Sequence, residues 1–204
     1  MNRVIALAAT GGLSTPSKMP GFCYSLPAKD CQVGAKLAKI KGSVCHKCYA
    51  LRGNYAWPRV KNKLQFRLNS LHNPLWIEAM TYLIRDSGDL HFRWHDSGDL
   101  QGLWHLSNIV RVAEALPEVK FWLPTREVKY VQDYLDTAKF PENLVVRISS
   151  PMIDMRPLNF PHTSTVHKGQ AYGHVCPART QDNKCGSCRA CWDRTIANVS
   201  YPYH

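Results

Sequence analysis

The chain of 204 residues is 45% hydrophobic and 20% charged, which is typical of a globular protein and excludes an intrinsically disordered one. No apolar run reaches the length of a membrane span, and eight cysteines are too few for a disulfide scaffold. We therefore expect a cytoplasmic protein whose clustered thiols are metal ligands. The net charge of +11 favours nucleic acid, nucleotides or an acidic protein as a partner, although solubility alone would also explain it.

The first predicted element is a buried strand in MNRVIALAATGG, because its apolar run is too short for a signal peptide. Residues 13–58 are rich in Gly, Pro, Ser and Lys, which predicts an irregular segment held in place by a metal rather than by a core. Residues 59–72 predict an amphipathic helix whose basic side chains lie on the surface. Asn73 and Pro74 end that helix and begin another, over 76–85.

Strands and helices alternate through the middle of the chain. Strands are predicted at 90–95, 120–124 and 144–149, and helices at 101–116 and 127–138. This alternation predicts an α/β fold, either a partial (β/α) barrel or a small parallel sheet, with cysteine-rich irregular segments at both ends that bind metal. We expect one domain over 1–204, in which 59–150 form the core and 151–204 are a loop followed by the C-terminal cysteines.

The C-terminal cysteines have the spacing of iron–sulfur ligands. Cys185, Cys188 and Cys191 form two successive C-x2-C steps, and Cys176 lies upstream as a fourth thiol. This is the ligand pattern of a cubane [4Fe–4S] cluster. A zinc site, or cysteines that are free or disulfide-bonded, remain alternatives, and His174 could replace one thiolate.

The N-terminal cysteines are more widely spaced. Cys31, Cys45 and Cys48 would supply three ligands and leave one iron open to a small molecule or to a fourth residue. These thiols could instead complete a site begun by the C-terminal cysteines, so one or two clusters are possible. Cys23 lies between two aromatic residues and is the candidate for a buried thiol without a metal.

Polar residues follow the three predicted strands of the middle region. The carboxyl ends of parallel strands meet on one face, where ligands bind. A small-molecule or cofactor site is therefore predicted there, although helix capping would explain some of these residues equally well. The candidates for this site are His95, Asp96, Ser97, Asp99, Arg126 and Ser149.

Four stretches together resemble a family of bacteriophage proteins known as gene product 88-like. They are SLPAKDC with GSVCHKCYALRGNY, then FRWHDSGDL, FWLPTRE and CPARTQDNKCGSCRACWD, and they span residues 25–193. The resemblance implies a phage origin and a role inside an infected bacterium, and it implies no particular reaction.

A more distant likeness is to the radical S-adenosylmethionine enzymes, which are partial α/β barrels with an open-iron cluster. It implies that Cys31, Cys45 and Cys48 hold such a cluster and that Asp99 contacts the amino group of S-adenosylmethionine. Ser149 or Arg126 would then lie near its carboxylate or ribose, and the C-terminal cysteines would hold an auxiliary cluster.

The leading hypothesis from the sequence is a phage iron–sulfur protein. The C-terminal cysteines would bind one [4Fe–4S] cluster, or cysteines from both ends would share one. The alternatives are an enzyme that uses S-adenosylmethionine, a nucleic-acid-binding module with a structural metal, and a zinc-stapled protein that acts on a host factor.

Overall fold

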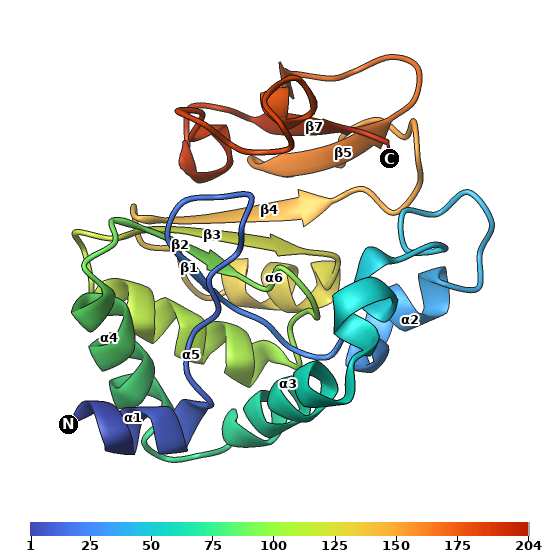
Figure 1. Ribbon diagram of the computed structural model, residues 1–204. Helices are drawn as coiled ribbons and strands as arrows, with labels where there is room; N and C mark the ends of the chain where they lie inside the picture. Colours follow the sequence, from blue (N-terminus) through green and yellow to red (C-terminus); the bar gives the residue numbers. More distant parts are fainter. Residues whose placement is uncertain (204) are drawn as a thin grey trace.

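The computed structural model describes residues 1–203, and within them the strands form one open sheet of seven parallel strands (Figure 1). The strands are β1 (Phe22–Tyr24), β2 (His91–Trp94), β3 (Lys120–Thr125), β4 (Leu144–Ser149), β5 (Thr163–His167), β6 (His174–Val175) and β7 (Asn198–Pro202). Their order is β1-β2-β3-β4-β5-β7-β6, so the first five strands are neighbours in sequence order. Every pairing between these strands is parallel. The prediction of an α/β fold with a parallel sheet is confirmed, and the sheet does not close into a barrel.

The helices cover one face of this sheet. They are α1 (Arg3–Thr10), α2 (Gln32–Leu37), α3 (Pro58–Ser70), α4 (Trp76–Ser87), α5 (Leu103–Glu114) and α6 (Val128–Leu135). Figure 1 shows α4, α5 and α6 along one face of β1–β4, whereas α2 lies beyond the carboxyl ends of the strands. The predicted helices 59–72, 76–85, 101–116 and 127–138 correspond to α3–α6 to within a few residues at each end. Within residues 1–203, no helix is both long enough and apolar enough to cross a bilayer.

The main hydrophobic core lies between the helices and the sheet. Trp76 of α4, Trp94 of β2 and Phe121 of β3 are at most 1% exposed and pack against one another and Leu106 of α5. Burying each of these large side chains contributes about 2–3 kcal/mol, so this core holds the first four strands in place.

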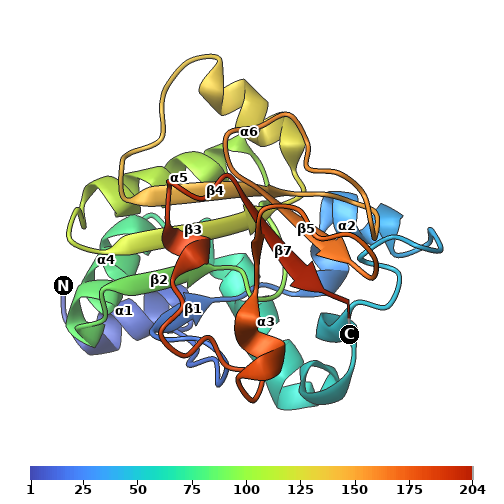
Figure 2. The ribbon, with the colours of Figure 1, turned by 90° about the horizontal axis from the view of Figure 1, so that it is seen from above.

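The opposite face of the sheet is covered by the C-terminal segment rather than by helices (Figure 2). A short 3₁₀ turn, η5 (Ala190–Trp192), packs on β3 and β4 and forms a second cluster with Trp122 and Val199. Trp192 donates a hydrogen bond from its indole Nε1 to the carbonyl oxygen of Phe92, at 2.9 Å. The last cysteines are therefore fixed against the sheet.

The prediction of a first strand was wrong, because residues Arg3–Thr10 form helix α1. The side chain of Asn2 caps it by accepting a hydrogen bond from the backbone N–H of Ile5, and Gly11 ends it in the left-handed conformation at φ 76°. The contact between α1 and α4 consists mainly of small residues, with Ala6 and Ala9 on α1 packed against Ala79 and Leu83 on α4. Val4 is 77% exposed, so the apolar run does not mark a buried strand.

Four strands lie in regions that were predicted to be irregular. Strand β1 has three residues within 13–58, and β5, β6 and β7 follow Ser150. Strands β5 and β7 carry buried polar side chains that bond to each other. The hydroxyl of Thr163 donates to Asn198 Oδ1 at 2.8 Å, and that of Thr165 donates to Ser200 Oγ at 3.1 Å. Because these polar residues satisfy one another inside the sheet, the alternation of apolar and polar residues that predicts a strand is missing.

Candidate functional site

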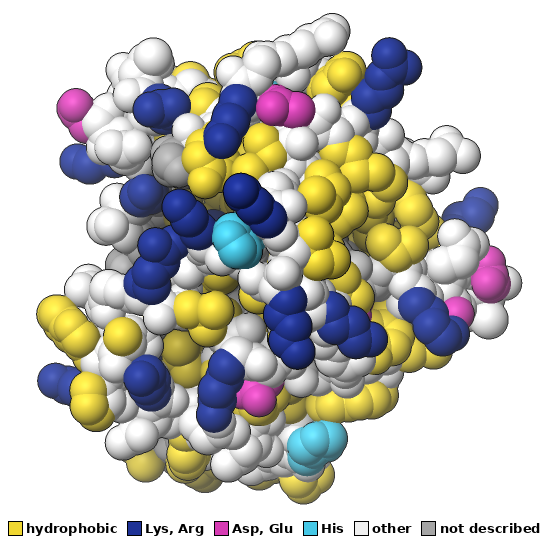
Figure 3. All heavy atoms as spheres, turned by 90° about the vertical axis from the view of Figure 1, so that its right-hand side faces the viewer, with side chains coloured by type: hydrophobic (Ala, Val, Ile, Leu, Met, Phe, Trp, Pro, Cys, Tyr) yellow, Lys and Arg dark blue, Asp and Glu magenta, His cyan; other side chains and the backbone are white. Residues whose placement is uncertain are grey.

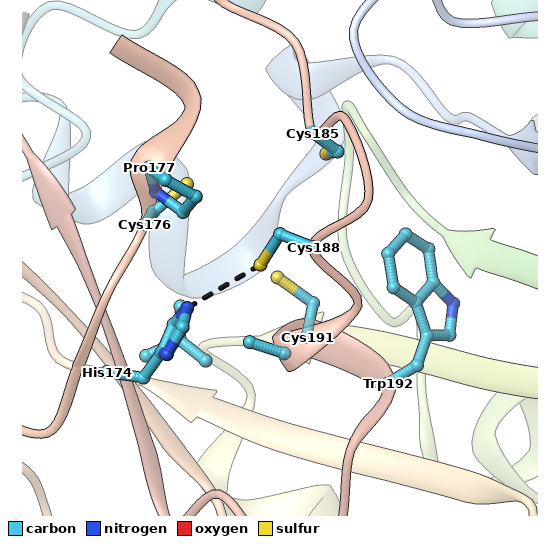
Figure 4. A pocket seen from close by; sticks show the side chains of 9 residues that line it. His174, Cys176, Pro177, Cys185, Cys188, Cys191 and Trp192 are labelled. Carbon is cyan, nitrogen blue, oxygen red and sulfur yellow. Dashed lines mark hydrogen bonds between the residues drawn. The ribbon is translucent and has the colours of Figure 1, made fainter. Parts of the chain in front are cut away.

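Four C-terminal cysteines and one histidine line a cavity of about 20 Å³ on the sheet face opposite the helices (Figure 4). Cys176 follows β6, and its backbone N–H donates to the carbonyl oxygen of Ser200 on β7 at 2.9 Å. Cys191 lies in η5, and Cys185 and Cys188 lie in the turns that lead to it. All four predicted C-terminal thiols therefore line one cavity, to which β6, β7 and η5 hold their segments.

These thiols are held in a partly apolar environment. The Sγ of Cys188 lies 3.5 Å from Nε2 of His174, and the Sγ of Cys191 lies 3.2 Å from the hydroxyl of Tyr201. Burial raises the pKa of Cys191 to about 11, and burial likewise raises the pKa of Cys176 and of Cys185. The thiols of Cys176, Cys185 and Cys191 therefore stay protonated at neutral pH unless a metal displaces the proton.

Arg147 holds the cysteine-bearing segment against the sheet. This β4 residue is fully buried, and its guanidinium donates to the carbonyl oxygens of Cys191 at 3.0 Å, Ala190 at 2.9 Å and Asp193 at 2.8 Å. A further bond at 2.8 Å reaches the carbonyl oxygen of Ile196. Carbonyl dipoles, rather than a carboxylate, compensate this charge, and burial lowers the pKa of Arg147. The sequence contained no indication of this role.

The three predicted N-terminal ligands lie beyond the carboxyl ends of the strands. Cys31 precedes α2, and Gly34 in the first turns of that helix faces it. A Cβ atom placed on Gly34 would lie 2.9 Å from the Cβ of Cys31, 3.6 Å from its Sγ and 3.7 Å from the Sγ of Cys45. Burial raises the pKa of the Cys31 thiol, and the charges of Asp99, Cys48 and Cys45 raise it further. A side chain at position 34 would therefore contact Cys31 and Cys45, and glycine leaves this space beside the thiols open. We call this space the cradle at Gly34. Cys48 belongs to the same group, because its charge acts on the pKa of Cys31.

Asp99 joins two strand ends beside this group. Its carboxylate accepts hydrogen bonds from the Thr125 hydroxyl at 2.6 Å and from the backbone N–H of Arg126 at 2.9 Å. Helix capping does not explain Asp99, because α5 has Gly102 at its cap position and no side-chain capping bond. The Nε of Arg126 is buried without a hydrogen-bond partner among the described residues. Burial raises the pKa of Cys31 and of Cys45, and the positive charge of Arg126 opposes that rise. Asp99 and Arg126 thus adjoin the N-terminal thiols.

Glu127 is a residue of this region that sequence reasoning missed. Its Oε1 accepts a hydrogen bond from the backbone N–H of Val33 at 2.9 Å, and its own N–H donates to the Thr125 hydroxyl at 3.0 Å. Glu127 is only 4% exposed, and it fixes the first turn of α2 next to Cys31. The only hint in the sequence was its place directly after a strand end.

The remaining predicted cofactor residues do not join Asp99 and Arg126. Ser97 donates to the carbonyl oxygen of Leu26 at 2.8 Å, and Ser149 bonds to Ser164 at 2.9 Å, so both serve the backbone and the sheet. His95 is buried under the helices, where burial lowers its pKa to about 4. Asp96 lies in a different pocket, beside α3. The structure thus gives these residues different surroundings, and a common role in binding a cofactor stays a prediction.

Within residues 1–203, no group of three or more His, Cys, Asp or Glu side chains is arranged to hold a single metal ion. The two sets of cysteines are also separate from each other. The cavity that Cys176, Cys185, Cys188 and Cys191 line has no N-terminal cysteine in its lining.

Cys23 lies in strand β1 and is fully buried. Its Sγ is 3.5 Å from the hydroxyl of Ser25, and burial raises its pKa to about 11. Cys23 pairs in register with Arg93 of β2, so its backbone belongs to the sheet. Cys23 remains the candidate for a structural thiol.

The molecular surface at the carboxyl ends of the strands is basic. Figure 3 shows this face, on which Lys and Arg side chains far outnumber Asp and Glu. Positive charge also predominates in the whole chain, which has 26 Lys and Arg against 15 Asp and Glu. Such a surface attracts anions.

Comparison with known proteins gives one result. A family model described as "Gene product 88" matches residues 3–183 of the chain. No curated protein and no solved structure matches. The likeness to radical S-adenosylmethionine enzymes is therefore without support, and an open sheet replaces the barrel that the likeness implied.

Proposed function

The chain belongs to the gene product 88 family, and we propose that it is a phage iron–sulfur protein that binds at least one [4Fe–4S] cluster through its C-terminal cysteines. The observation that supports this most strongly is the common cavity of Cys176, Cys185, Cys188 and Cys191. Four thiols from a C-x2-C-x2-C run and one upstream cysteine are the complete ligand set of a cubane.

The absence of a single-ion site among residues 1–203 is compatible with this proposal. In a cubane each cysteine binds a different iron, so the four sulfurs surround the cluster and do not converge on one point. A cavity of about 20 Å³ holds roughly one water molecule, so cluster binding requires the thiols to move apart. The intervening residues 181–184 are exposed, while Arg147 bonds to the backbone at the Cys191 end.

We propose that Cys31, Cys45 and Cys48 bind a second cluster. The cradle at Gly34 and the buried Nε of Arg126 beside the thiols support this, because thiolates and cluster carry negative charge that a cation offsets. Three thiolates leave one iron for a fourth ligand, either a residue of the chain or a small molecule.

The test is the iron, sulfide, zinc and absorption analysis of protein purified without oxygen. One cluster gives about four irons and four sulfides per chain, and two clusters give about eight of each. Colourless protein without iron would overturn the proposal. Cys188→Ala should lose about four irons, whereas Cys23→Ala should lose none.

A structural zinc ion is the second candidate, and one distance favours it. The 3.5 Å between Cys188 Sγ and His174 Nε2 suits two neighbouring ligands of a tetrahedral ion, and the cavity is small. In that case the basic chain would act as a zinc-stapled module that binds nucleic acid or a host protein. Stoichiometric zinc without iron, together with DNA or RNA binding that weakens steeply with salt, would favour this candidate.

A further inference from the structure

Helix α3 directs three cations toward a pocket that is separate from both sets of cysteines. Arg59, Lys63 and Arg67 follow at intervals of four residues, so they lie along one side of the helix. All three line a pocket of about 200 Å³. Ser25, directly after β1, and Asp96, just after β2, also line it, so the pocket lies where parallel sheets bind ligands.

Arg67 supplies this pocket with a buried donor that no described protein group accepts. Its side chain was predicted to lie on the surface but is fully buried. Its Nε donates to the carbonyl oxygen of Gly11 at 3.4 Å and its Nη1 to the hydroxyl of Ser14 at 2.8 Å. Its Nη2 is buried and has no hydrogen-bond partner among residues 1–203. A buried guanidinium with an unused donor is costly unless a bound group accepts from it.

The charges around Arg67 are not balanced by ion pairs. None of the ion pairs among the described residues includes Arg59, Lys63 or Arg67. Like charges four residues apart destabilise a helix. Burial lowers the pKa of Lys63, and the charges of Arg67 and Arg59 lower it further. An anion between these side chains would offset both the repulsion between the cations and the cost of burying the charge of Lys63.

Asp96 is the one carboxylate that lines the pocket. Its oxygens are already engaged, because Oδ2 accepts from the hydroxyl of Tyr55 at 2.9 Å and Oδ1 accepts from the hydroxyl of Ser25. Asp96 therefore fixes one wall and leaves the opposite wall with an excess of positive charge. The hydroxyl of Ser14, which accepts from Arg67, can donate its own proton to a ligand.

We propose that this pocket binds a phosphate group, either free or as the terminal phosphate of a small molecule. A phosphate dianion carries three acceptor oxygens and close to two charges, which suits three cations and a hydroxyl better than a carboxylate does. The volume exceeds that of one phosphate group and leaves room for the group attached to it. The positive end of the α3 dipole, which begins at Pro58, adds to the attraction.

The test is calorimetric titration of the purified full chain with inorganic phosphate, and separately with glycerol 3-phosphate, at constant ionic strength. We expect saturable binding of one phosphate group per chain. Arg59→Ala and Lys63→Ala should each weaken binding by about tenfold, because each removes a charged hydrogen-bond donor. Tighter binding of the ester identifies a phosphorylated small molecule as the ligand, and equal or weaker binding identifies free phosphate.

Lys61→Ala is the matched control, because Lys61 is an exposed cation on the same helix that does not line the pocket. It should change the affinity by less than about twofold, since screened surface charge contributes little. No saturable binding to the wild-type chain would overturn the proposal. So would equal weakening by Lys61→Ala and Lys63→Ala, which would indicate unspecific attraction to a basic surface. Arg67→Lys, which keeps the charge but removes Nη2, should also weaken binding. If this variant fails to fold, the affinities of Arg59→Ala and Lys63→Ala test the proposal.

Discussion

The guanidinium of Arg147 on β4 donates a hydrogen bond from Nε to the carbonyl oxygen of Cys191, 3.0 Å away. This contact connects the centre of the sheet to the last thiol of the C-terminal cavity. Because Arg147 also bonds to the carbonyl oxygens of Ala190 and Asp193, it fixes the backbone on both sides of Cys191. One end of the candidate ligand set is therefore rigid before any metal binds.

Arg147→Met should destabilise the protein and disorder the C-terminal site. The change leaves several buried carbonyl oxygens without donors, so the free energy of unfolding should fall by about 3 kcal/mol. Urea unfolding measures this, and the iron content of the variant should fall as well. Arg111→Met is the control, because Arg111 is exposed on α5, and its unfolding should stay within about 0.5 kcal/mol of the wild type. Equal stability of the two variants would contradict this role for Arg147.

Gly34→Ala should remove the N-terminal cluster without unfolding the chain. Alanine is the better helix former by about 1 kcal/mol, but its Cβ would lie 2.9 Å from the Cβ of Cys31 and would displace that ligand. If two clusters bind, iron should fall from about eight to about four per chain. Gly169→Ala is the control, since the nearest atom to its added Cβ is 3.9 Å away. Unchanged iron in Gly34→Ala would show that no cluster uses this cradle.

Stability should decline with acidity because of His95. Burial lowers the pKa of His95 from 6.5 to about 4, so the folded protein holds this ring neutral. The pKa of His95 is lower in the folded than in the unfolded protein. Its contribution to the free energy of unfolding is therefore fully present above pH 6.5 and is lost as the pH falls toward 4. The loss should reach about 3 kcal/mol in the free energy of unfolding.

His95→Asn isolates this contribution. Asparagine tolerates the positive φ of 60° at this position and can donate to the carbonyl oxygen of Tyr24, as His95 does. Burial raises the pKa of Asp99, which acts in the opposite direction, but Asp99 is present in both proteins and cancels in the difference. Denaturant unfolding between pH 7 and 4 should therefore be less acid-sensitive in the variant, and parallel pH curves would contradict the assignment.

The eight cysteines should separate into three classes by substitution. Cys188→Ala should lose the C-terminal cluster, and Cys45→Ala should lose the N-terminal one. Cys23→Ala should keep all iron, because its thiol lies inside β1 and costs only about 1 kcal/mol of stability when truncated. Iron and sulfide analysis of the three variants measures this. A joint loss of all iron in either of the first two variants would instead support one shared cluster.

The sequence predicted the elements that have a clear hydrophobic period. The strand at 144–149 coincides with β4, and the four middle helices lie where their apolar stripes placed them. The hydrophobic period did not predict the strands in which buried polar residues bond to one another. Thr163 and Asn198 are buried in β5 and β7, and no rule of alternation detects such a pair. Helix α1 was not predicted because its buried apolar residues are Ala6 and Ala9, and the positions of two alanines do not distinguish the period of a helix from that of a strand.

Cysteine spacing predicted which thiols lie together, but not what surrounds them. Ligand sets that are close in sequence form locally, so both sets of cysteines could be listed in advance. Asp96 and Asp99 are three residues apart, yet Asp96 lines the pocket beside α3 whereas Asp99 bonds to Thr125 and Arg126, and the turn between them contains Gly98 at φ 82°. Arg147 and Glu127 act through backbone contacts across 44 and 94 positions of the chain, and such contacts appear only once the chain is folded.

Native mass spectrometry of protein purified without oxygen tests the central claim most directly. It weighs the folded chain with whatever it binds, and it distinguishes a cluster from separate metal ions. We predict a mass that exceeds the bare chain by one or two complete [4Fe–4S] clusters, with one cluster lost in Cys188→Ala. A chain without added mass, or one that carries only zinc, would contradict the account.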